Sequence, residues 1–192
     1  MGRRSDHSSA ELREIIISEA HRQISEVGFA RFSAREVARR IGYSIGTIYN
    51  VFGSYDHLML AINGRTLDMW RSALETRLAN AEEDRLQAAV EAYFDFALQN
   101  RHAWTAIYDF RLPDDAEVPD EYSDRVRSIM DVVAQLLTEI LPQERASEAQ
   151  QLSGSLLAIV HGHCFFMLSG TFRVLGEADP LNTCMQRVRT LI

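Results

Sequence analysis

The chain has 192 residues, of which 46% are hydrophobic and 24% are charged, and such proportions are typical of a globular protein with a core of its own. Its length allows one domain, or one small and one larger domain. The 4 prolines and 10 glycines are too few for a β-sandwich, which turns about every ten residues. The two cysteines, Cys164 and Cys184, lie in apolar surroundings and make no case for a disulfide framework or a paired-cysteine zinc site.

The net charge of −7 is unevenly distributed along the chain. Residues 1–55 carry a net charge of +2 and residues 56–192 a net charge of −9. A mildly basic segment on an acidic body favours contact with a polyanion through the first quarter of the chain. A chance scatter of a few charges would give the same numbers, so this pattern needs support from a motif.

The chain shows no sign of secretion or membrane insertion. Residues 1–20 are polar and charged, which predicts that there is no signal peptide. The longest apolar stretch, Leu156 to Leu168, is broken by His161, Gly162 and His163, and we expect it to be too short and too polar to span a bilayer. The expected location is the cytoplasm, with no membrane partner.

Three helices are predicted in the first quarter of the chain. Apolar residues from Leu12 to Val27 recur at steps of three and four, which predicts an amphipathic helix that Ser8 or Ser9 caps and Gly28 ends. A second, short helix follows the capping box formed by Ser33 and Glu36 and ends at Gly42. Ser44 then caps a third helix, which covers residues 45–52.

The rest of the chain also predicts helices. A long fourth helix runs to about residue 79, and further helices are expected at about 83–100, 102–110, 120–141 and 145–171, with a shorter one starting near Pro180. Residues 112–119, with two prolines and three acidic residues, are expected to form a loop. No period-two pattern appears, so the predicted fold class is all-α.

Two short helices separated only by Gly42, Tyr43 and Ser44, and packed on a longer preceding helix, are the components of a helix-turn-helix. The outward positions of the third helix are small or hydrogen-bonding and carry no charge. We expect Gly46 to let the backbone approach DNA closely, and Asn50 to read an adenine edge.

The run FSAREVARRIGYSIGTIYNVFGSYDHL, residues 32–58, resembles the DNA-binding signature of the tetracycline-repressor (TetR) family. The resemblance covers about residues 10–60. It implies contacts with DNA phosphates from Ser33, Arg35, Thr47 and Tyr49, and contacts with bases from Ile45, Gly46 and Asn50. The partner it implies is double-stranded operator DNA.

The chain departs from this family at the end of the motif. The family usually carries lysines there, whereas this chain has Gly53 and Tyr55, so the usual cationic anchor is missing. Arg3 and Arg4 near the amino terminus are candidates to compensate for it, and a charged tail without a role in binding is the alternative.

The larger carboxyl-terminal part is expected to bind a small, mainly apolar effector. Trp104 and Tyr108 are four residues apart on one helix face and each has a polar tip, so we predict that they line the effector pocket, together with His161. A role in the core is the alternative for these aromatic residues. His161 and His163 point in different directions on a helix, so we expect a core or interface role for them, with no metal site and no cofactor.

These features predict a three-helix DNA-binding head at residues 1–55 and a helical ligand-binding and dimerisation body at residues 56–192. An apolar stripe that includes Leu156, Val160 and Cys164 predicts a homodimer through the carboxyl-terminal helices, with internal packing as the alternative. The expected function is that of a ligand-responsive transcription regulator without enzymatic activity, most simply a repressor released from a palindromic operator. The alternatives are an all-α enzyme with a dispersed site and an interaction scaffold.

Overall fold

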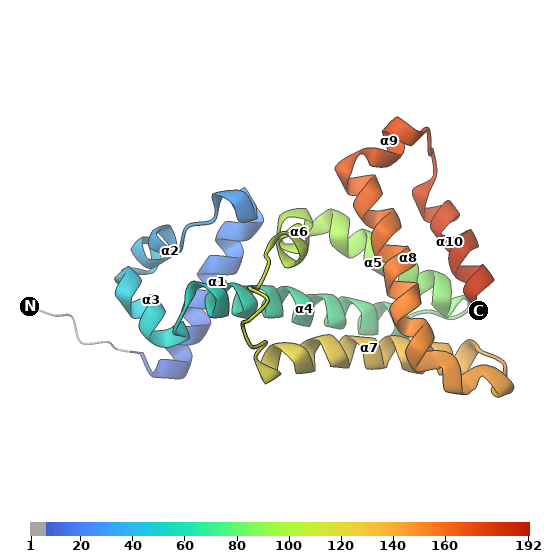
Figure 1. Ribbon diagram of the computed structural model, residues 1–192, viewed down its shortest axis with the longest axis horizontal. Coiled ribbons are helices and arrows are strands. Elements are labelled where there is room, and N and C mark those ends of the chain that lie inside the picture. The colour runs from blue at the N-terminus through green and yellow to red at the C-terminus, as the bar shows by residue number, and fades with distance from the viewer. Residues whose placement is uncertain (1–6) are drawn as a thin grey trace, which may run out of the picture. The chain divides into compact units, whose positions relative to one another are not determined.

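The computed structural model describes residues 7–192, and this part of the chain contains helices and no strand (Figure 1). The all-α prediction is therefore confirmed for the described residues. The elements are α1 (Ser9–Val27), η1 (Phe29–Arg31), α2 (Ala34–Ile41), α3 (Ile45–Phe52), α4 (Tyr55–Ala79), α5 (Arg85–Gln99), α6 (Arg101–Asp109), α7 (Asp120–Ile140), η2 (Gln143–Glu148), α8 (Ala149–Ser169), α9 (Thr171–Leu175) and α10 (Pro180–Leu191).

The helices form two compact units, and the chain passes between them more than once. The first unit comprises residues 7–66 and 102–122, and the second comprises residues 67–101 and 123–192. Helix α4 supplies its first half to one unit and its second half to the other. Helix α6 and the segment after it belong to the unit that holds α1, α2 and α3, although they are distant from these helices in sequence.

The first unit is built on an apolar core that α1, α2, α3 and the start of α4 share. The side chains of Ile16, Val37, Ile48 and Leu58, one from each helix, are fully buried in it. Ala103 and Ala106 of α6 belong to the same core. Because each of the short helices α2 and α3 buries an apolar face against α1, the core holds them at a fixed orientation.

Side-chain caps set the starts of these helices, as the sequence predicts. Ser8 forms a reciprocal capping box with Glu11, in which Ser8 Oγ accepts from the Glu11 amide at 3.2 Å. The capping box predicted at Ser33 is only half right. Ser33 Oγ accepts from the amide of Glu36 at 3.3 Å, but the amide of Ser33 donates to Gln23 Oε1 because the Glu36 carboxylate is bound to Arg39 and Arg40.

In the second unit α8 packs along α10, and α5 lies against both. Figure 1 shows α8 and α10 joined through α9. Leu156, Val160 and Cys164 of α8 and Val188 of α10 are buried within the single chain. The prediction that these three residues of α8 form the dimer seam is therefore wrong, because they pack inside the chain instead.

The carboxyl-terminal helix predicted at about 145–171 is divided in the structure. Residues 143–148 form the 3-10 helix η2, and Gly170 ends α8 with a left-handed conformation (φ 78°) before α9 begins. The stretch Gln143–Ser169, longer than the apolar stretch 156–168 considered from the sequence, is long and apolar enough to cross a membrane by length and composition alone, a test that the core helix of a soluble protein also passes. Only 22% of its most apolar window is buried within the chain, so much of this apolar helix is left without a covering surface.

His21 of α1 is an exception in the core, because it is 8% exposed and its Nε2 atom has no hydrogen-bond partner among the described residues. Burial, with a smaller contribution from Arg65, lowers the pKa of His21. The folded protein therefore binds a proton at this site less readily than the unfolded chain does. We expect the free energy of unfolding to be unaffected by this histidine above about pH 6.5 and to fall as the pH drops below that value.

Thermal unfolding between pH 7.5 and pH 5 measures this effect. His21→Leu should reduce the loss of melting temperature on acidification. An unchanged pH dependence in His21→Leu would show that other groups cause the acid destabilisation.

Candidate nucleic-acid interface

The turn between α2 and α3 is made by a glycine and a cap. Gly42 has φ 76° and ψ 25°, a left-handed conformation that other residues adopt only with strain, and its amide donates to the last turn of α2. The amide of Tyr43 donates to the carbonyl of Ala38 at 2.9 Å. Ser44 Oγ then accepts from the amide of Thr47 at 3.1 Å and begins α3. The predicted helix-turn-helix is present.

Helix α3 has one buried and one open face. Ile48 and Phe52 point into the core, while Gly46, Tyr49 and Asn50 are exposed. Thr47 is half-buried, and its hydroxyl is 3.0 Å from that of Ser44. The open face therefore offers a phenol, a carboxamide and uncovered backbone, which are groups that can hydrogen-bond to DNA.

A surface hollow of about 490 Å³ lies between α2 and the start of α3. It is lined by Ser33, Arg35, Glu36, Ala38, Arg39, Tyr43 and Ile45. Three residues predicted from the sequence to contact DNA, Ser33, Arg35 and Ile45, are thus brought to one concave surface. Arg35 is exposed and makes no hydrogen bond or ion pair with any residue in the range 7–192.

Sequence reasoning did not identify the other polar residues of this hollow. The hydroxyl of Tyr43 is 2.9 Å from His7 Nδ1, and Arg39 forms an ion pair with Glu36. The two arginines, Arg39 and Arg40, hold the pKa of the Glu36 carboxyl down at about 2. The four-residue spacing of Arg35 and Arg39 is a signal that could have placed both on one face of α2, whereas Tyr43 lies beyond the end of that helix.

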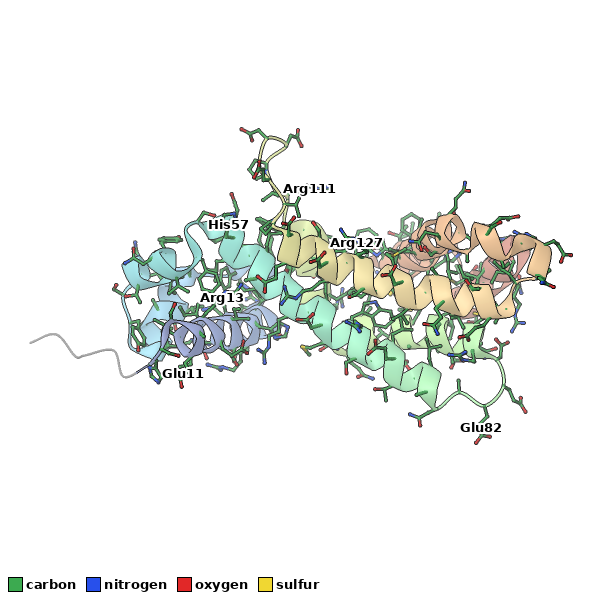
Figure 2. The ribbon with its side chains drawn as sticks, turned by 90° about the horizontal axis from the view of Figure 1, so that it is seen from below. Glu11, Arg13, His57, Glu82, Arg111 and Arg127 are labelled. Carbon is green, nitrogen blue, oxygen red and sulfur yellow. The ribbon has the colours of Figure 1, made fainter. Side chains whose placement is uncertain are left out.

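Polar and aromatic contacts surround the end of α3 and the start of α4. His57 Nδ1 is 3.2 Å from the carbonyl of Phe52, and the guanidinium of Arg13 lies 5.5 Å from the centre of the Phe52 ring; His57 and Arg13 are labelled in Figure 2. Tyr55, at the position where the family usually has a lysine, is 37% exposed and packs on Phe32. Arg3 and Arg4, the candidates for a substitute anchor, lie outside the described residues.

The residues predicted to bind an effector fall into both units. Trp104 and Tyr108 contact each other in the first unit, with their ring centres 5.1 Å apart, and Trp104 is only 3% exposed. His161 belongs to the second unit, where its Nδ1 atom is 2.9 Å from the hydroxyl of Tyr93. Burial lowers the pKa of His161.

The second unit contains an aromatic cluster built from residues that are distant in sequence. Trp70 of α4 contacts Tyr93 and Phe96 of α5, with ring-centre distances of 5.2 and 5.5 Å. His161 joins this cluster through Tyr93 and also lies beside Phe165. The cluster therefore combines apolar rings with a phenol and an imidazole, which can orient a polar group on an apolar ligand.

Two family models match the chain. Residues 16–62 match the model described as bacterial regulatory proteins, tetR family, and residues 86–189 match a tetracyclin repressor-like C-terminal domain. The first match contains the helix-turn-helix. The second covers more than half of the chain.

A curated relative and several solved structures are similar to the chain. The HTH-type transcriptional activator FasR of Mycolicibacterium smegmatis is 29% identical over 136 residues, which are 69% of this chain and 61% of FasR. The chain thus spans about three fifths of that relative. A Rhodococcus sp. RHA1 protein of unknown function aligns with a TM-score of 0.72 at 21% identity, over 100% of this chain and 97% of that one. A TetR transcription regulator from Haloarcula marismortui aligns with a TM-score of 0.63 at 19% identity, over 95% of this chain and 96% of that one.

Proposed function

Because the chain belongs to the TetR family of bacterial transcription regulators, we propose that it is a repressor that a small, mainly apolar effector releases from a palindromic operator. Both matching family models describe regulators and not enzymes or scaffolds. FasR is named an activator, so the direction of regulation is part of the proposal. The expected site of action is the cytoplasm, where the DNA lies.

The observation that carries the proposal is the open face of α3 beside the hollow. We assign phosphate contacts to Ser33, Arg35, Thr47 and Tyr49, and contacts with base edges to Ile45, Gly46 and Asn50. The exposure of Gly46, Tyr49 and Asn50, and the absence of charge on this face, support entry of α3 into a major groove. The isolated Arg35 cation supports a phosphate contact next to it.

Two substitutions on α3 test this assignment. Tyr49→Phe should weaken the binding of every DNA sequence alike, by about 1 to 2 kcal/mol, because it removes one hydrogen bond to a charged phosphate. Asn50→Ala should instead relax the preference at one symmetric pair of operator positions, by about 1 to 3 kcal/mol. Gel-shift titration measures the uniform loss of affinity, and sequencing the genomic fragments that each purified variant retains measures the change of preference. Equal, small effects of the two changes would contradict the assignment.

For the effector we propose contacts with Trp104 and Tyr108 in the first unit; His161 lies in the second unit, beside Tyr93, and is a separate candidate there. Helix α6, which carries Trp104, is part of the first unit: His102 Nδ1 is 3.0 Å from the carbonyl of Ser25, and Asn63 Nδ2 donates to the carbonyl of Ala106 at 3.4 Å. An effector that displaces α6 would therefore move the DNA-binding head with it. Since coupling is reciprocal, such an effector binds the DNA-bound protein more weakly by the same factor.

Fluorescence of the two tryptophans, Trp70 and Trp104, tests this site. In a Trp70→Phe variant, where Trp104 is the one remaining tryptophan, we expect an effector that releases operator DNA to change the emission. Trp104→Phe, which leaves only Trp70, reports separately on the aromatic cluster of the second unit. An emission change from Trp70 alone would place the effector at that cluster instead.

Proteins of this family act as dimers, and we propose that this chain dimerises through the exposed face of α8. Gln151, Ser155, Ala158 and Phe165 are exposed and recur at steps of three, four and seven residues, so they form one stripe. Ser155, Ala158 and Phe165 supply small or apolar side chains on an exposed face of α8, which supports an interface with a second copy.

A further inference from the structure

Arg39 is a second cation at the hollow beside the recognition helix. It lies four residues after Arg35, so both side chains are on the same face of α2, and both line the hollow. The Arg39 side chain is 74% exposed even though it is paired. A phosphate that approaches Arg35 would therefore also come within reach of Arg39.

The partners of Arg39 differ from those of its neighbour Arg40. Among residues 7–192, Arg39 is bound only to Glu36, through two hydrogen bonds of 2.6 and 2.7 Å. The Arg40 side chain is 26% exposed and is bound to three carboxylates, those of Glu36 at 2.9 Å, Glu26 at 3.1 Å and Glu19 at 3.2 Å. Arg40 thus joins α2 to α1, whereas the exposed pair of Arg39 and Glu36 lies within one helix and contributes little to stability.

We propose that Arg39 is a phosphate-binding residue that Glu36 holds in reserve: when DNA binds, its guanidinium exchanges the Glu36 carboxylate for a phosphodiester oxygen beside Arg35. The exchange does not leave Glu36 unpaired, because Arg40 still donates to it. The inference rests on the proposed DNA binding. It also makes Glu36 a negative charge at the interface that opposes the binding of every DNA sequence.

Fluorescence anisotropy with a labelled duplex of random sequence tests the inference, since a phosphate contact does not depend on sequence. Arg39→Gln should lower the affinity and reduce the slope of log affinity against log salt by about 0.9, the value for one phosphate contact. When the salt is raised from 50 to 200 mM, the Arg39→Gln variant should therefore lose about threefold less affinity than the wild type loses. Arg39→Lys, which keeps the charge, should keep the slope.

Glu36→Gln should raise the affinity for the same duplex, because Arg39 no longer has a competing carboxylate. The double variant Glu36→Gln/Arg39→Gln should lose this gain. Arg22→Gln is the matched control: Arg22 is 55% exposed and pairs with Glu19 and Glu26, but it does not line the hollow. It removes the same charge and should leave the affinity and the salt slope as in the wild type.

The inference is overturned if Arg39→Gln and Arg22→Gln behave alike, or if Glu36→Gln binds DNA more weakly than the wild type while its melting temperature is unchanged. If the wild type itself shows no salt-dependent binding to any duplex, the proposed DNA-binding function is wrong, and the role of Arg39 is wrong with it.

Discussion

Replacing Gly46 by leucine should greatly weaken specific DNA binding while leaving the protein folded. Gly46 is exposed on α3, and a Cβ atom built there would meet only Ser44 Oγ, at 3.5 Å, an ordinary contact distance. Leucine also favours a helix more than glycine does, by roughly 1 kcal/mol. The substitution is therefore compatible with the fold, and its cost falls on the approach to DNA.

The expected loss of affinity is about 100-fold or more. A leucine side chain on the open face would hold the α3 backbone away from the base edges, so several contacts worth about 1 to 3 kcal/mol each would be lost together. Gly46→Ala adds a single methyl group and should cause a smaller loss. Gel-shift titration with retained genomic fragments measures the affinities, and circular dichroism checks the fold. A folded Gly46→Leu variant that binds within about threefold of the wild type would place the groove contact elsewhere.

The parts of the site that the sequence predicted well are those that local chemistry determines. Gly42 and Ser44 mark the turn because a left-handed residue and a side-chain cap are needed there, and α3 begins and ends at the predicted residues. The exposed positions of α3 follow from its helical period. The same local reasoning failed at Ser33, where Glu36 has two competing arginine partners on its own helix.

Features that depend on distant residues could not be predicted in the same way. The ion pairs of Arg40 join residues 14 and 21 positions apart in sequence. Helix α6 joins the head core through Ala103 and Ala106, and no periodicity shows which core an apolar face will enter. Helix α8 is apolar on more than one side, so the period alone did not separate its internal face, with Leu156 and Val160, from the exposed one.

The two faces of α8 should respond differently to a charged substitution. Ala158→Arg should convert the dimer to monomers without unfolding the chain, because Ala158 is exposed in the single chain and an arginine there is solvated. At a dimer seam the same arginine would be an unpaired buried charge, which costs several kcal/mol. Val160→Arg, in contrast, would bury the charge inside the single chain and should destabilise each subunit.

Loss of the dimer should also weaken operator binding by about 100-fold to 10,000-fold, because the second head no longer binds at a high effective concentration. Ala79→Arg, at an exposed alanine at the end of α4, is the matched control and should remain dimeric with normal DNA affinity. Sedimentation velocity at micromolar concentration gives the oligomeric state, and gel-shift titration gives the affinity. If Ala158→Arg remains dimeric, the seam does not include this face of α8; if the wild type is monomeric, then the four exposed residues of the stripe need another partner.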